Sequence, residues 1–466
     1  MSGGLRAYPA YRDSGLPWLG AIPAHWEVRR AKYYLREADE RSLDGTEERL
    51  SVSHLTGVTP RREKNITMFE AESYVGHKLC HPGDVVVNTM WAWMGALGVS
   101  RHHGIVSPAY GVYRPLRTTD FEPAFLDYLL RTPDLVAEYV RRSTGIQASR
   151  LRLYAHKFLD IALPCPPIEE QRAICKYLDA HRRLVRGYER AKRQIIALLD
   201  EERAHAVRIA AMRGTGGSIA IKPINLPWLP EVPEHWEARH LGSEVRVLNG
   251  YPFDAAHFAH DRGHPLVRIR DIASQTTTIR YDGDDVPEAR IEHGDLLVGM
   301  DGDFNAALWA GSSALLNQRV CCVRPGDRVD REFLALVLPL ALSWINAVTL
   351  STTVKHLSSA DIRRIRVPMP NIEEQRQVVE HVRTATAPLI GAKHRIEREL
   401  ALIAEYRTRT VSDVVTGQLD VRELARILSD VAEEIVNKDT SALLDAELSS
   451  DEEELSDLAA VTSDAD

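Results

Sequence analysis

LPWLGAIPAHWE, at residues 16–27, returns as LPWLPEVPEHWE at residues 226–237, with eight of the twelve positions identical. Two shorter phrases recur in the same order: PCPPIEEQR (164–172) as PMPNIEEQR (368–376), and HPGDVVV (81–87) as EHGDLLV (292–298). A period of roughly 200 residues is too long for a solenoid repeat, and each copy is large enough to bury its own core. The sequence therefore predicts two homologous halves.

The composition is that of a globular protein with two or more domains. Of 466 residues, 44% are hydrophobic and 27% are charged. The five cysteines include no CxxC pair, which favours free thiols in a reducing compartment over a disulfide framework. The first residues, MSGGLRAYPAYRDSG, lack the apolar core of a signal peptide. We therefore expect a cytoplasmic protein.

One apolar run has nearly the length of a membrane span. FLALVLPLALSWINAVTL, at residues 333–350, contains no charged residue. Its counterpart in the first half, FLDYLLRTPDLVAEYVRR at residues 125–142, carries acidic and basic residues. Because homologous segments share an environment, we predict that both are helices packed on a domain core and that the chain does not enter a membrane.

The net charge of −8 is unevenly distributed. Residues 430–466 contain thirteen acidic residues and one lysine, a net charge of −12, so the rest of the chain sums to +4. The high charge of this tail predicts disorder. It could act as a plain solubilising tail or fold back over a basic face. The mildly basic body is compatible with nucleic-acid binding.

Each half is predicted to be a mixed α/β globular part followed by a long helix. In the first half, Pro17, Trp18, Pro23 and Trp26 predict a rigid, irregular segment anchored on a core by its tryptophans. Short strand-like runs broken by Gly, Pro and Asn follow within residues 50–115. Residues 123–142 read as helix.

After each IEEQR phrase, apolar residues follow a heptad-like spacing. A helix over residues 169–213 would be roughly 65 Å long at about 1.5 Å per residue, too long to bury its apolar stripe on one small domain. We expect the two long helices to pack together as an antiparallel coiled coil with a pseudo-two-fold internal repeat. The first stripe comprises Ile174, Leu178, Val185, Tyr188, Ile195, Leu199, Ala206 and Ile209, with His181, Lys192 and Glu202 at the remaining positions; the second comprises Val379, Val382, Leu389, Ile396, Leu400, Ile403 and Val414.

The fold class is therefore α+β, with two similar globular parts joined by two long helices. The predicted boundaries are residues 1–167 for the first globular part, 168–213 for the central helix, 214–371 for the second globular part, 372–425 for the C-terminal helix and 426–466 for the acidic tail.

The sequence contains no familiar catalytic signature. GxxxxGK[ST], HExxH and GxSxG are all missing. His77, Cys80 and His81 could ligate a metal, but they lack a second cluster and read better as a strand leading into a turn. Cys321 and Cys322 are adjacent on a strand-like run and would face opposite ways. We predict no catalytic residue and no metal site.

These repeated phrases, in the same order in both halves and with two long helices, resemble the DNA-specificity subunit of Type I restriction–modification systems. The resemblance covers about residues 10–425. It implies that each globular part is a target recognition domain reading half of a bipartite, asymmetric DNA site, and that the helical pair spaces the half-sites. It further implies two docked modification subunits, which bind S-adenosylmethionine and methylate adenine, and two ATP- and Mg-dependent restriction subunits. This chain would bind no cofactor and catalyse nothing.

Three alternatives stay open. The chain could serve a methylation-only or other phage-defence methyltransferase. It could be a coiled-coil adaptor that binds proteins alone. The test is whether the globular parts bind DNA at all, with an affinity that falls as salt rises. It could also be an enzyme with an unrecognised site.

Candidate DNA contacts follow from residue chemistry, since Arg, Lys, Asn and Gln read base edges in the major groove. Two pairs of candidates are chosen by position. Arg268 and Arg270 are expected to share one face of a strand. Lys355 and His356 are expected where Gln147 and Arg150 lie in the first copy. Trp91 and Trp93 are expected in the core. The candidates are Arg61, Arg62, Lys64, Arg101, His102, Gln147, Arg150, Arg268, Arg270, Asn305, Gln318, Arg319, Lys355 and His356.

Overall fold

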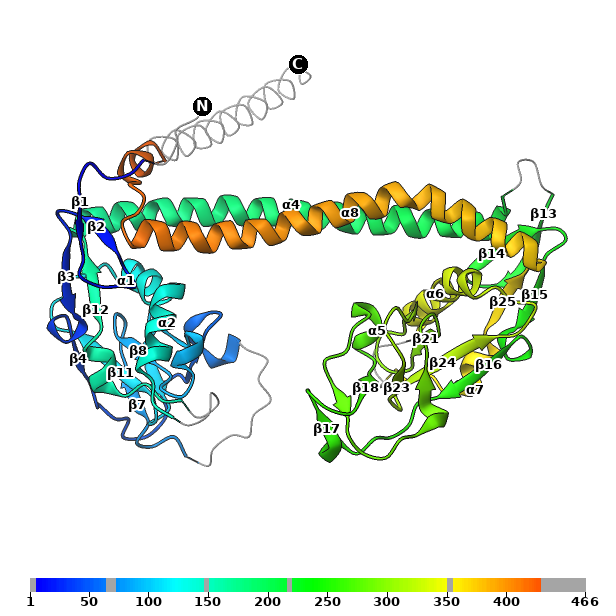
Figure 1. The fold of residues 1–466 in the computed structure, drawn as a ribbon, viewed down its shortest axis with the longest axis horizontal. Helices are drawn as coiled ribbons and strands as arrows, with labels where there is room; N and C mark the ends of the chain where they lie inside the picture. Colours follow the sequence, from blue (N-terminus) through cyan, green and yellow to red (C-terminus); the bar gives the residue numbers. More distant parts are fainter. Residues whose placement is uncertain (1–5, 64–72, 146–150, 216–219, 350–354, 429–466) are drawn as a thin grey trace, which may run out of the picture. The chain divides into compact units, whose positions relative to one another are not determined.

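The computed structural model describes residues 6–63, 73–145, 151–215, 220–349 and 355–428 (Figure 1). Three of the candidate DNA contacts, Lys64, Gln147 and Arg150, lie outside these residues, as does most of the acidic tail. The chain divides into two compact units. Unit 1 comprises residues 1–190 and 400–466, and unit 2 comprises residues 191–399.

A four-stranded antiparallel sheet of the same strand order lies at the centre of each unit, as the duplication predicts. The strands are short and their central members are buried on both faces. In unit 1 the order is β4 (Leu35–Glu37), β11 (Gly111–Pro115), β8 (Val85–Val87) and β9 (Leu97–Val99); in unit 2 it is β16 (Val245–Asn249), β24 (Val320–Pro325), β21 (Leu296–Gly299) and β22 (Ala306–Leu308).

The repeated Gly-Asp pair before β8 and β21 has a structural explanation. Gly83 has a φ of 92°, in the left-handed region that a glycine tolerates, and turns the chain into β8. The buried carboxylate of Asp84 then accepts hydrogen bonds from Nε and Nη2 of Arg114 on β11, each at 3.0 Å. Asp295 is paired with Arg324 in the same way in unit 2. Each GD phrase therefore joins the two central strands.

The helices beside these sheets differ between the units. We predicted one helix over residues 123–142, but the structure has two, α1 (Pro123–Leu130) and α2 (Pro133–Arg142). Residues before a proline avoid the α conformation, and the helix breaks at Thr132. The corresponding helix in unit 2, α6 (Arg331–Val348), continues through Pro339.

Helix α6 confirms the predicted core packing of the apolar run. Phe333, Val337, Leu338 and Leu342 are buried in the main core of unit 2. By length and composition alone, α6 is also the one helix among the described residues that could span a membrane. The burial of one complete face in a sheet-containing core explains the apolar composition without a membrane.

The remaining elements connect and cover these cores. Unit 1 contains the antiparallel pairs β1 (Tyr11–Asp13) with β2 (Ala21–Pro23), β3 (Glu27–Arg30) with β12 (Ala162–Cys165), β5 (Leu50–Ser53) with β6 (Gly57–Pro60) and β7 (Lys78–Cys80) with β10 (Gly104–Val106), together with α3 (Ala155–Leu159). Unit 2 contains the pairs β13 (Ile221–Leu226) with β14 (Leu229–Pro233) and β15 (Glu237–His240) with β25 (Arg366–Met369), a sheet ordered β17 (Phe258–Ala259), β19 (Arg280–Tyr281), β18 (His264–Val267), β23 (Ala314–Leu316) and β20 (Arg290–Ile291), and helices α5 (Asp271–Ser274) and α7 (Ser359–Arg364). The segment around Pro17 and Trp26 that we expected to be irregular therefore includes the short strand β2, which pairs with β1 just before it.

Two long helices follow the IEEQR phrases, α4 (Ile168–Arg213) and α8 (Ile372–Val415). Within unit 2, Lys192 Nζ lies 2.8 Å from Glu399 Oε2, and Lys393 Nζ lies 2.7 Å from Asp200 Oδ2. Rising residue numbers in α4 thus meet falling numbers in α8, so the pair is antiparallel, as predicted. In unit 1 the His181 ring lies 5.7 Å from that of Tyr406.

The predicted apolar stripe of α4 is wrong in its middle. Tyr188 is 46% exposed and Ile195 is 42% exposed, and Glu202 is exposed as well. Half-buried positions lie at Lys192 and Leu199, as predicted, and at Ile196, which was not predicted. An α-helix has 3.6 residues per turn, so a strict seven-residue spacing drifts around its surface.

The Trp-rich phrase of unit 1 holds the ends of both long helices. His25 Nε2 lies 2.7 Å from Glu170 Oε2, and Trp26 Nε1 donates to Glu170 Oε1 at 3.0 Å, so both contact the start of α4. Gly417 ends α8 with a φ of 78° against the same rings. A Cβ there would lie 2.4 Å from Pro23 and 3.1 Å from Trp26.

The second phrase repeats this arrangement in unit 2. His235 Nε2 lies 3.0 Å from both carboxylate oxygens of Glu374 at the start of α8. Gly214, which follows α4, lies against Trp236 and Pro233. One difference is that Trp236 Nε1 is buried without a hydrogen-bond partner among the described residues. The phrase is thus repeated because each unit must fix the start of one helix and the end of the other.

Candidate nucleic-acid interface

The loop after β21 gathers several of the predicted DNA contacts of unit 2. Its backbone is fixed on both sides, because Met300 N donates to Arg319 O at 3.0 Å and Leu357 N donates to Met300 O at 2.8 Å. Three chain segments, residues 300–305, 317–319 and 355–357, therefore lie together at one end of the central sheet. We call them the unit 2 loop cluster.

Basic side chains in this cluster surround one carboxylate. Asp301 bonds to Nη1 of Arg319 and to Nδ1 of His356. Lys355 Nζ lies 3.7 Å from Asp303 Oδ1 and donates to Asn346 O at 3.2 Å. The Arg319 and His356 side chains are 55% and 53% exposed, whereas Asp301 is 21% exposed. The Arg319 and His356 side chains consequently face solvent, and the Asp301 carboxylate lies beneath them.

Two other predicted contacts of the cluster are placed differently from each other. Gln318 is exposed at the turn before β24, where its N–H donates to Tyr251 O at 3.0 Å. Asn305 is turned inward, because its Oδ1 is buried without a partner among the described residues and faces Gly299 of β21. Its amide oxygen is therefore not presented to solvent.

The prediction that Arg268 and Arg270 share a strand face is wrong. Strand β18 ends at Val267, and Arg270 has an αR backbone just before α5. Asp271 causes this turn, since its Oδ2 accepts from the backbone N–H of Arg268 at 2.9 Å and from its Nε at 3.2 Å. Arg270 is exposed, whereas Arg268 is half-buried in this local ion pair.

Unit 1 builds a corresponding cluster at the end of β8, which we call the unit 1 loop cluster. Leu153 N donates to Thr89 O at 3.0 Å, and Thr89 Oγ1 donates to Ala109 O at 2.9 Å. Trp91 in this loop is 51% exposed, which corrects its predicted place in the core, and nearby Tyr154 is 50% exposed. Aromatic surface here takes the place of the basic groups of unit 2.

The structure also corrects the alignment of the two copies. Leu153 and Leu357 each donate a backbone hydrogen bond to the loop after a central strand, so these two residues are equivalent. His356 thus corresponds to Arg152, which is exposed and which the sequence analysis missed, and not to Arg150. The signal was present, because 204 residues separate Leu153 from Leu357 and also separate the two IEEQR phrases.

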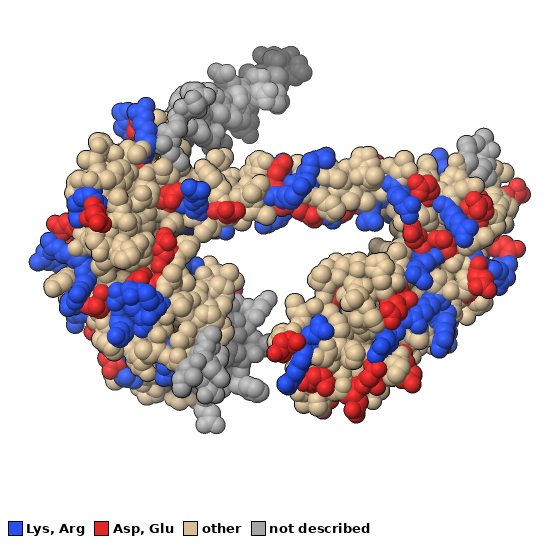
Figure 2. Space-filling view, in the orientation of Figure 1, with Lys and Arg blue, Asp and Glu red and all other residues tan. Residues whose placement is uncertain are grey.

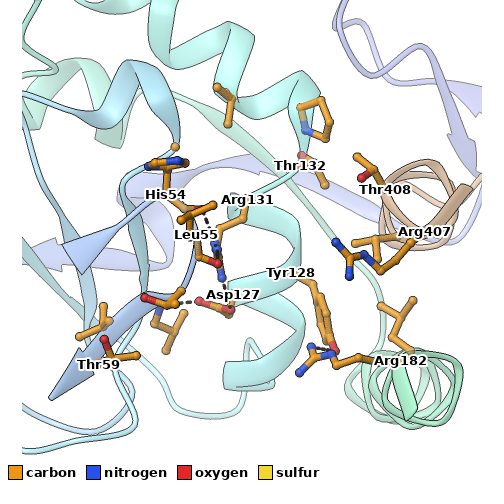
Figure 3. A pocket seen from close by; sticks show the side chains of 18 of the residues that line it. His54, Leu55, Thr59, Asp127, Tyr128, Arg131, Thr132, Arg182, Arg407 and Thr408 are labelled. Atoms are coloured by element: carbon orange, nitrogen blue, oxygen red, sulfur yellow. Dashed lines mark hydrogen bonds and ion pairs between the residues drawn. The ribbon is translucent and has the colours of Figure 1, made fainter. Parts of the chain in front are cut away.

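The remaining described candidates of unit 1 lie on other segments of the chain. Arg61 and Arg62 form the short 3-10 helix after β6, where Arg62 Nη1 lies 2.8 Å from Glu48 Oε2. Arg101 and His102 line a cleft of about 660 Å³ between the globular part of unit 1 and the long helices. Figure 3 shows this cleft, with Arg131, Arg182 and Arg407 among its lining side chains. In Figure 2 basic and acidic side chains alternate on the drawn face and form no single continuous patch.

Chemistry for catalysis is not evident among the described residues. They contain no group of three His, Cys, Asp or Glu side chains placed to hold a metal ion. The thiols of Cys321 and Cys322 are buried, and burial raises the pKa of each to about 12, so both stay protonated and unreactive at neutral pH. The exposed loop clusters offer hydrogen-bond donors, charge and aromatic rings.

Comparison with known proteins points in the same direction. Residues 233–401 match the family described as Type I restriction modification DNA specificity domain. The specificity subunit of the Type I restriction enzyme EcoBI from Escherichia coli is 37% identical over 198 residues, which make up 42% of this chain and 42% of that protein. The match therefore spans less than half of that relative.

Two further matches extend over more of the chain. The specificity subunit of the Type I restriction enzyme MjaVIII from Methanocaldococcus jannaschii is 22% identical over 317 residues, or 64% of this chain and 71% of that protein. A solved chain from a study of complex assembly and conformational transition of a type I R-M system has a TM-score of 0.53 and 17% identity, covering 84% of this chain and 98% of that one. The last likeness concerns the fold. With its duplicated units, antiparallel long helices and loop clusters, the chain is similar to Type I restriction–modification DNA-specificity subunits.

Proposed function

We propose that this chain reads a bipartite, asymmetric DNA site, one half-site per unit. The observation that supports this most directly is the equivalent placement of a loop cluster after β8 and after β21, with different side chains on the two. Equivalent placement gives both units the same way of approaching a duplex. Different side chains, Arg319 and His356 in one and Trp91 and Arg152 in the other, give them different sequence preferences.

Arg319 is the strongest candidate for base recognition. A guanidinium group can donate two parallel hydrogen bonds to O6 and N7 of guanine in the major groove. Asp301 beneath it holds the group in one orientation, which reduces the entropy lost when DNA binds. The neighbouring Lys355 adds positive charge for the phosphates, and His356 adds a ring nitrogen for hydrogen bonding.

The chain itself would catalyse nothing and bind no cofactor. Its partners would be double-stranded DNA, two modification subunits carrying S-adenosylmethionine, and two restriction subunits using ATP and Mg. The complex would act in the cytoplasm. Support comes from the family and from the two relatives, which are specificity subunits of Type I restriction enzymes.

Adenine-methylation mapping in the host, with and without this gene, tests the proposal. We expect one bipartite motif to lose methylation when the gene is deleted and to regain it on complementation. Complementation with the Arg319→Ala variant should change the motif in a single half-site. If deletion leaves every methylated motif intact although the modification subunits are expressed, the DNA-reading proposal is wrong and a protein-binding adaptor becomes the better account.

A further inference from the structure

The cleft of unit 1 is rich in arginine. Among the described residues that line it, five are arginines and one, Asp127, is acidic. The lining also includes three histidines. Two of the arginines come from the globular part and three from the long helices. The arginines are Arg101, Arg131, Arg182, Arg186 and Arg407.

The acidic groups around the cleft leave an excess of positive charge. Asp127 lies 3.7 Å from Arg131, whose Nη2 also donates to the carbonyl oxygens of His54 and Leu55. Arg182 stacks over the Tyr128 ring at 4.9 Å and donates to its hydroxyl, with Asp179 at 3.9 Å. These contacts orient the guanidinium groups, as Figure 3 shows for Arg131 and Arg182.

Arg407, the third helical arginine, also has a carboxylate within ion-pair distance. Arg407 Nη1 lies 3.8 Å from Glu189 Oε1. Together with Asp127 and Asp179, Glu189 makes three carboxylates against five arginines. The pKa of His181, which also lines the cleft, is lowered by burial and by the positive charge of Arg407. His181 therefore stays neutral at physiological pH and adds no charge of its own.

Unit 2 has the equivalent cleft, but its chemistry is different. Positions 204 residues apart line the two: Leu178, Arg182 and Arg186 correspond to Val382, Thr386 and Ile390, and Arg407, Thr408 and Val411 correspond to Arg203, Ala204 and Val207. The unit 2 cleft has two arginines and two acidic residues, with leucines and alanines between them. The cation-rich cleft is therefore a property of one copy, and a partner that docks alike on both copies does not explain it.

An acidic ligand for this cleft is attached to the same unit. Residues 430–466 have a net charge of −12. The segment before them, which ends at residue 428, is packed in the unit 1 core through Val421 and Ala425. Residues 429–466 can extend about 125 Å at about 3.3 Å per residue, so reach is not limiting. Tethering also raises the local concentration of such a segment to roughly millimolar.

We propose that the arginine-lined cleft of unit 1 binds the chain's own acidic C-terminal segment, residues 430–466, through Arg182, Arg186 and Arg407. Charge complementarity, the attachment of the segment to unit 1 and the replacement of Arg182 and Arg186 by Thr386 and Ile390 in the unit 2 cleft all favour this occupant. A segment held there places negative charge beside unit 1 and opposes unspecific DNA binding. The proposal concerns this chain alone and does not depend on the DNA site it reads.

The experiment uses full-length protein. In a tail-neutral chain, twelve of the thirteen acidic residues of 430–466, all except Asp466, are replaced by the corresponding amides, which leaves one acidic residue against Lys438 and removes the charge that would hold the segment in the cleft. A fluorescent peptide of residues 430–466 is added in trans, and its anisotropy is followed at low and at high salt. We expect micromolar binding by the tail-neutral chain that weakens about tenfold at high salt. The unmodified chain should bind the peptide more weakly because its own segment competes.

Cleft variants locate the binding. In the tail-neutral chain, Arg182→Gln with Arg186→Gln and Arg407→Gln should weaken peptide binding about tenfold or more. The matched control replaces Arg190, Arg208 and Arg398, exposed arginines on the same helices, by Gln. It removes the same charge and should bind the peptide as the tail-neutral chain does. Because Arg182 contacts Tyr128, the pair Arg186→Gln and Arg407→Gln is a second variant if the triple variant unfolds.

Two results would overturn the proposal. One is equal peptide affinity in the cleft variant and the control variant, which would show that attraction is merely long-range. The other is unchanged peptide binding combined with a loss of affinity for a short DNA duplex in the cleft variant alone. In that case the cleft binds the phosphate backbone of DNA. Methylation mapping is affected by neither result, so failure here is distinguishable from failure of the proposed function.

Discussion

Arg324 holds the buried carboxylate of Asp295 with two hydrogen bonds, from Nη2 to Oδ2 at 2.6 Å and from Nε to Oδ1 at 3.0 Å. The pair joins the end of β24 to the start of β21, at the opposite end of these strands from the unit 2 loop cluster. Burial, the largest single effect, raises the pKa of Asp295, but the hydrogen bonds from Arg324 and from the backbone of Glu292, together with the nearby arginine charges, lower it overall. The carboxylate is therefore ionised and structural at neutral pH.

Asp295→Asn should destabilise unit 2 by about 1–3 kcal/mol, because it replaces a charged acceptor by an amide that cannot match both donors of Arg324. Because the folded-state pKa is lowered, the stabilisation is present above the unfolded pKa of about 3.9 and is lost as the pH falls through the lower folded value. Urea denaturation at pH 7 measures the loss. Asp303→Asn, at a position 94% exposed, is the control and should leave the midpoint unchanged.

The buried glutamine of each IEEQR phrase should be equally sensitive. Gln375 Nε2 donates to Pro370 O at 2.9 Å and Arg328 O at 3.0 Å, and its Oε1 accepts from Asp330 N at 2.7 Å. Gln375→Ala leaves these backbone groups unpaired and should cost about 1–3 kcal/mol. Thermal unfolding followed by circular dichroism checks this. An equal melting temperature for Gln375→Ala and the exposed Gln377→Ala would contradict it.

Arg319→Ala should relax DNA discrimination at one base pair by about 1–3 kcal/mol. Asp301→Asn should act differently, raising affinity for all duplexes at low salt because it removes the carboxylate under Arg319 and His356. Competition binding against single-base variants of the mapped motif separates the two effects. Uniform weakening by Arg319→Ala across all competitors would mean that this side chain contacts phosphate only.

The length of the helical pair should set the spacing of the half-sites. Seven residues inserted after Ile195 and seven more after Ile396 keep the antiparallel register between Lys192 with Glu399 and Asp200 with Lys393. The insertions lengthen the pair by about 10 Å, or about three base pairs. Methylation mapping should show a longer spacer between unchanged half-sites. Changed half-sites with the original spacer would refute the idea that the length of the helical pair sets the spacing.

His181 should make unit 1 sensitive to mild acid. Its pKa in the folded protein is lowered by burial and by Arg407. Protonation is therefore easier in the unfolded chain, so stability is complete above about pH 6.5 and declines as the pH falls below the unfolded value. His181→Gln should flatten this decline between pH 5 and 7 in urea titrations. His205→Gln, at an exposed position of the same helix, should leave the decline in place.

Much of the fold was predictable because the sequence contains an internal repeat. The repeated phrases fixed the two halves, and the heptad spacing indicated the antiparallel helices. The same spacing failed at Tyr188 and Ile195, because a strict seven-residue period ignores the drift of a real helix. The predicted single helix over residues 123–142 failed because Pro133 has different consequences from Pro339, and local sequence does not show which helix will tolerate its proline.

The candidate sites were harder to predict, because loop geometry depends on contacts between distant segments. Arg319 and His356 do come together, around Asp301, whose role was not foreseen. Arg268 is bound by Asp271, only three residues away, in a turn that ends the strand. An alternating sequence pattern does not reveal such a turn. Whether these side chains contact DNA stays a prediction.

Asp420 N donates a hydrogen bond to Arg6 O at 2.7 Å, and this contact would allow the segments of the chain to be joined in a different order. It brings the segment after α8 to the start of unit 1, just as the peptide chain leads from α4 into the start of unit 2. Residues 6 and 420 thus lie side by side in unit 1, close enough for a short linker to join them. A circular permutant with residues 6 and 420 joined by a short linker, and new ends opened between residues 215 and 220, should fold to the same architecture and read the same site.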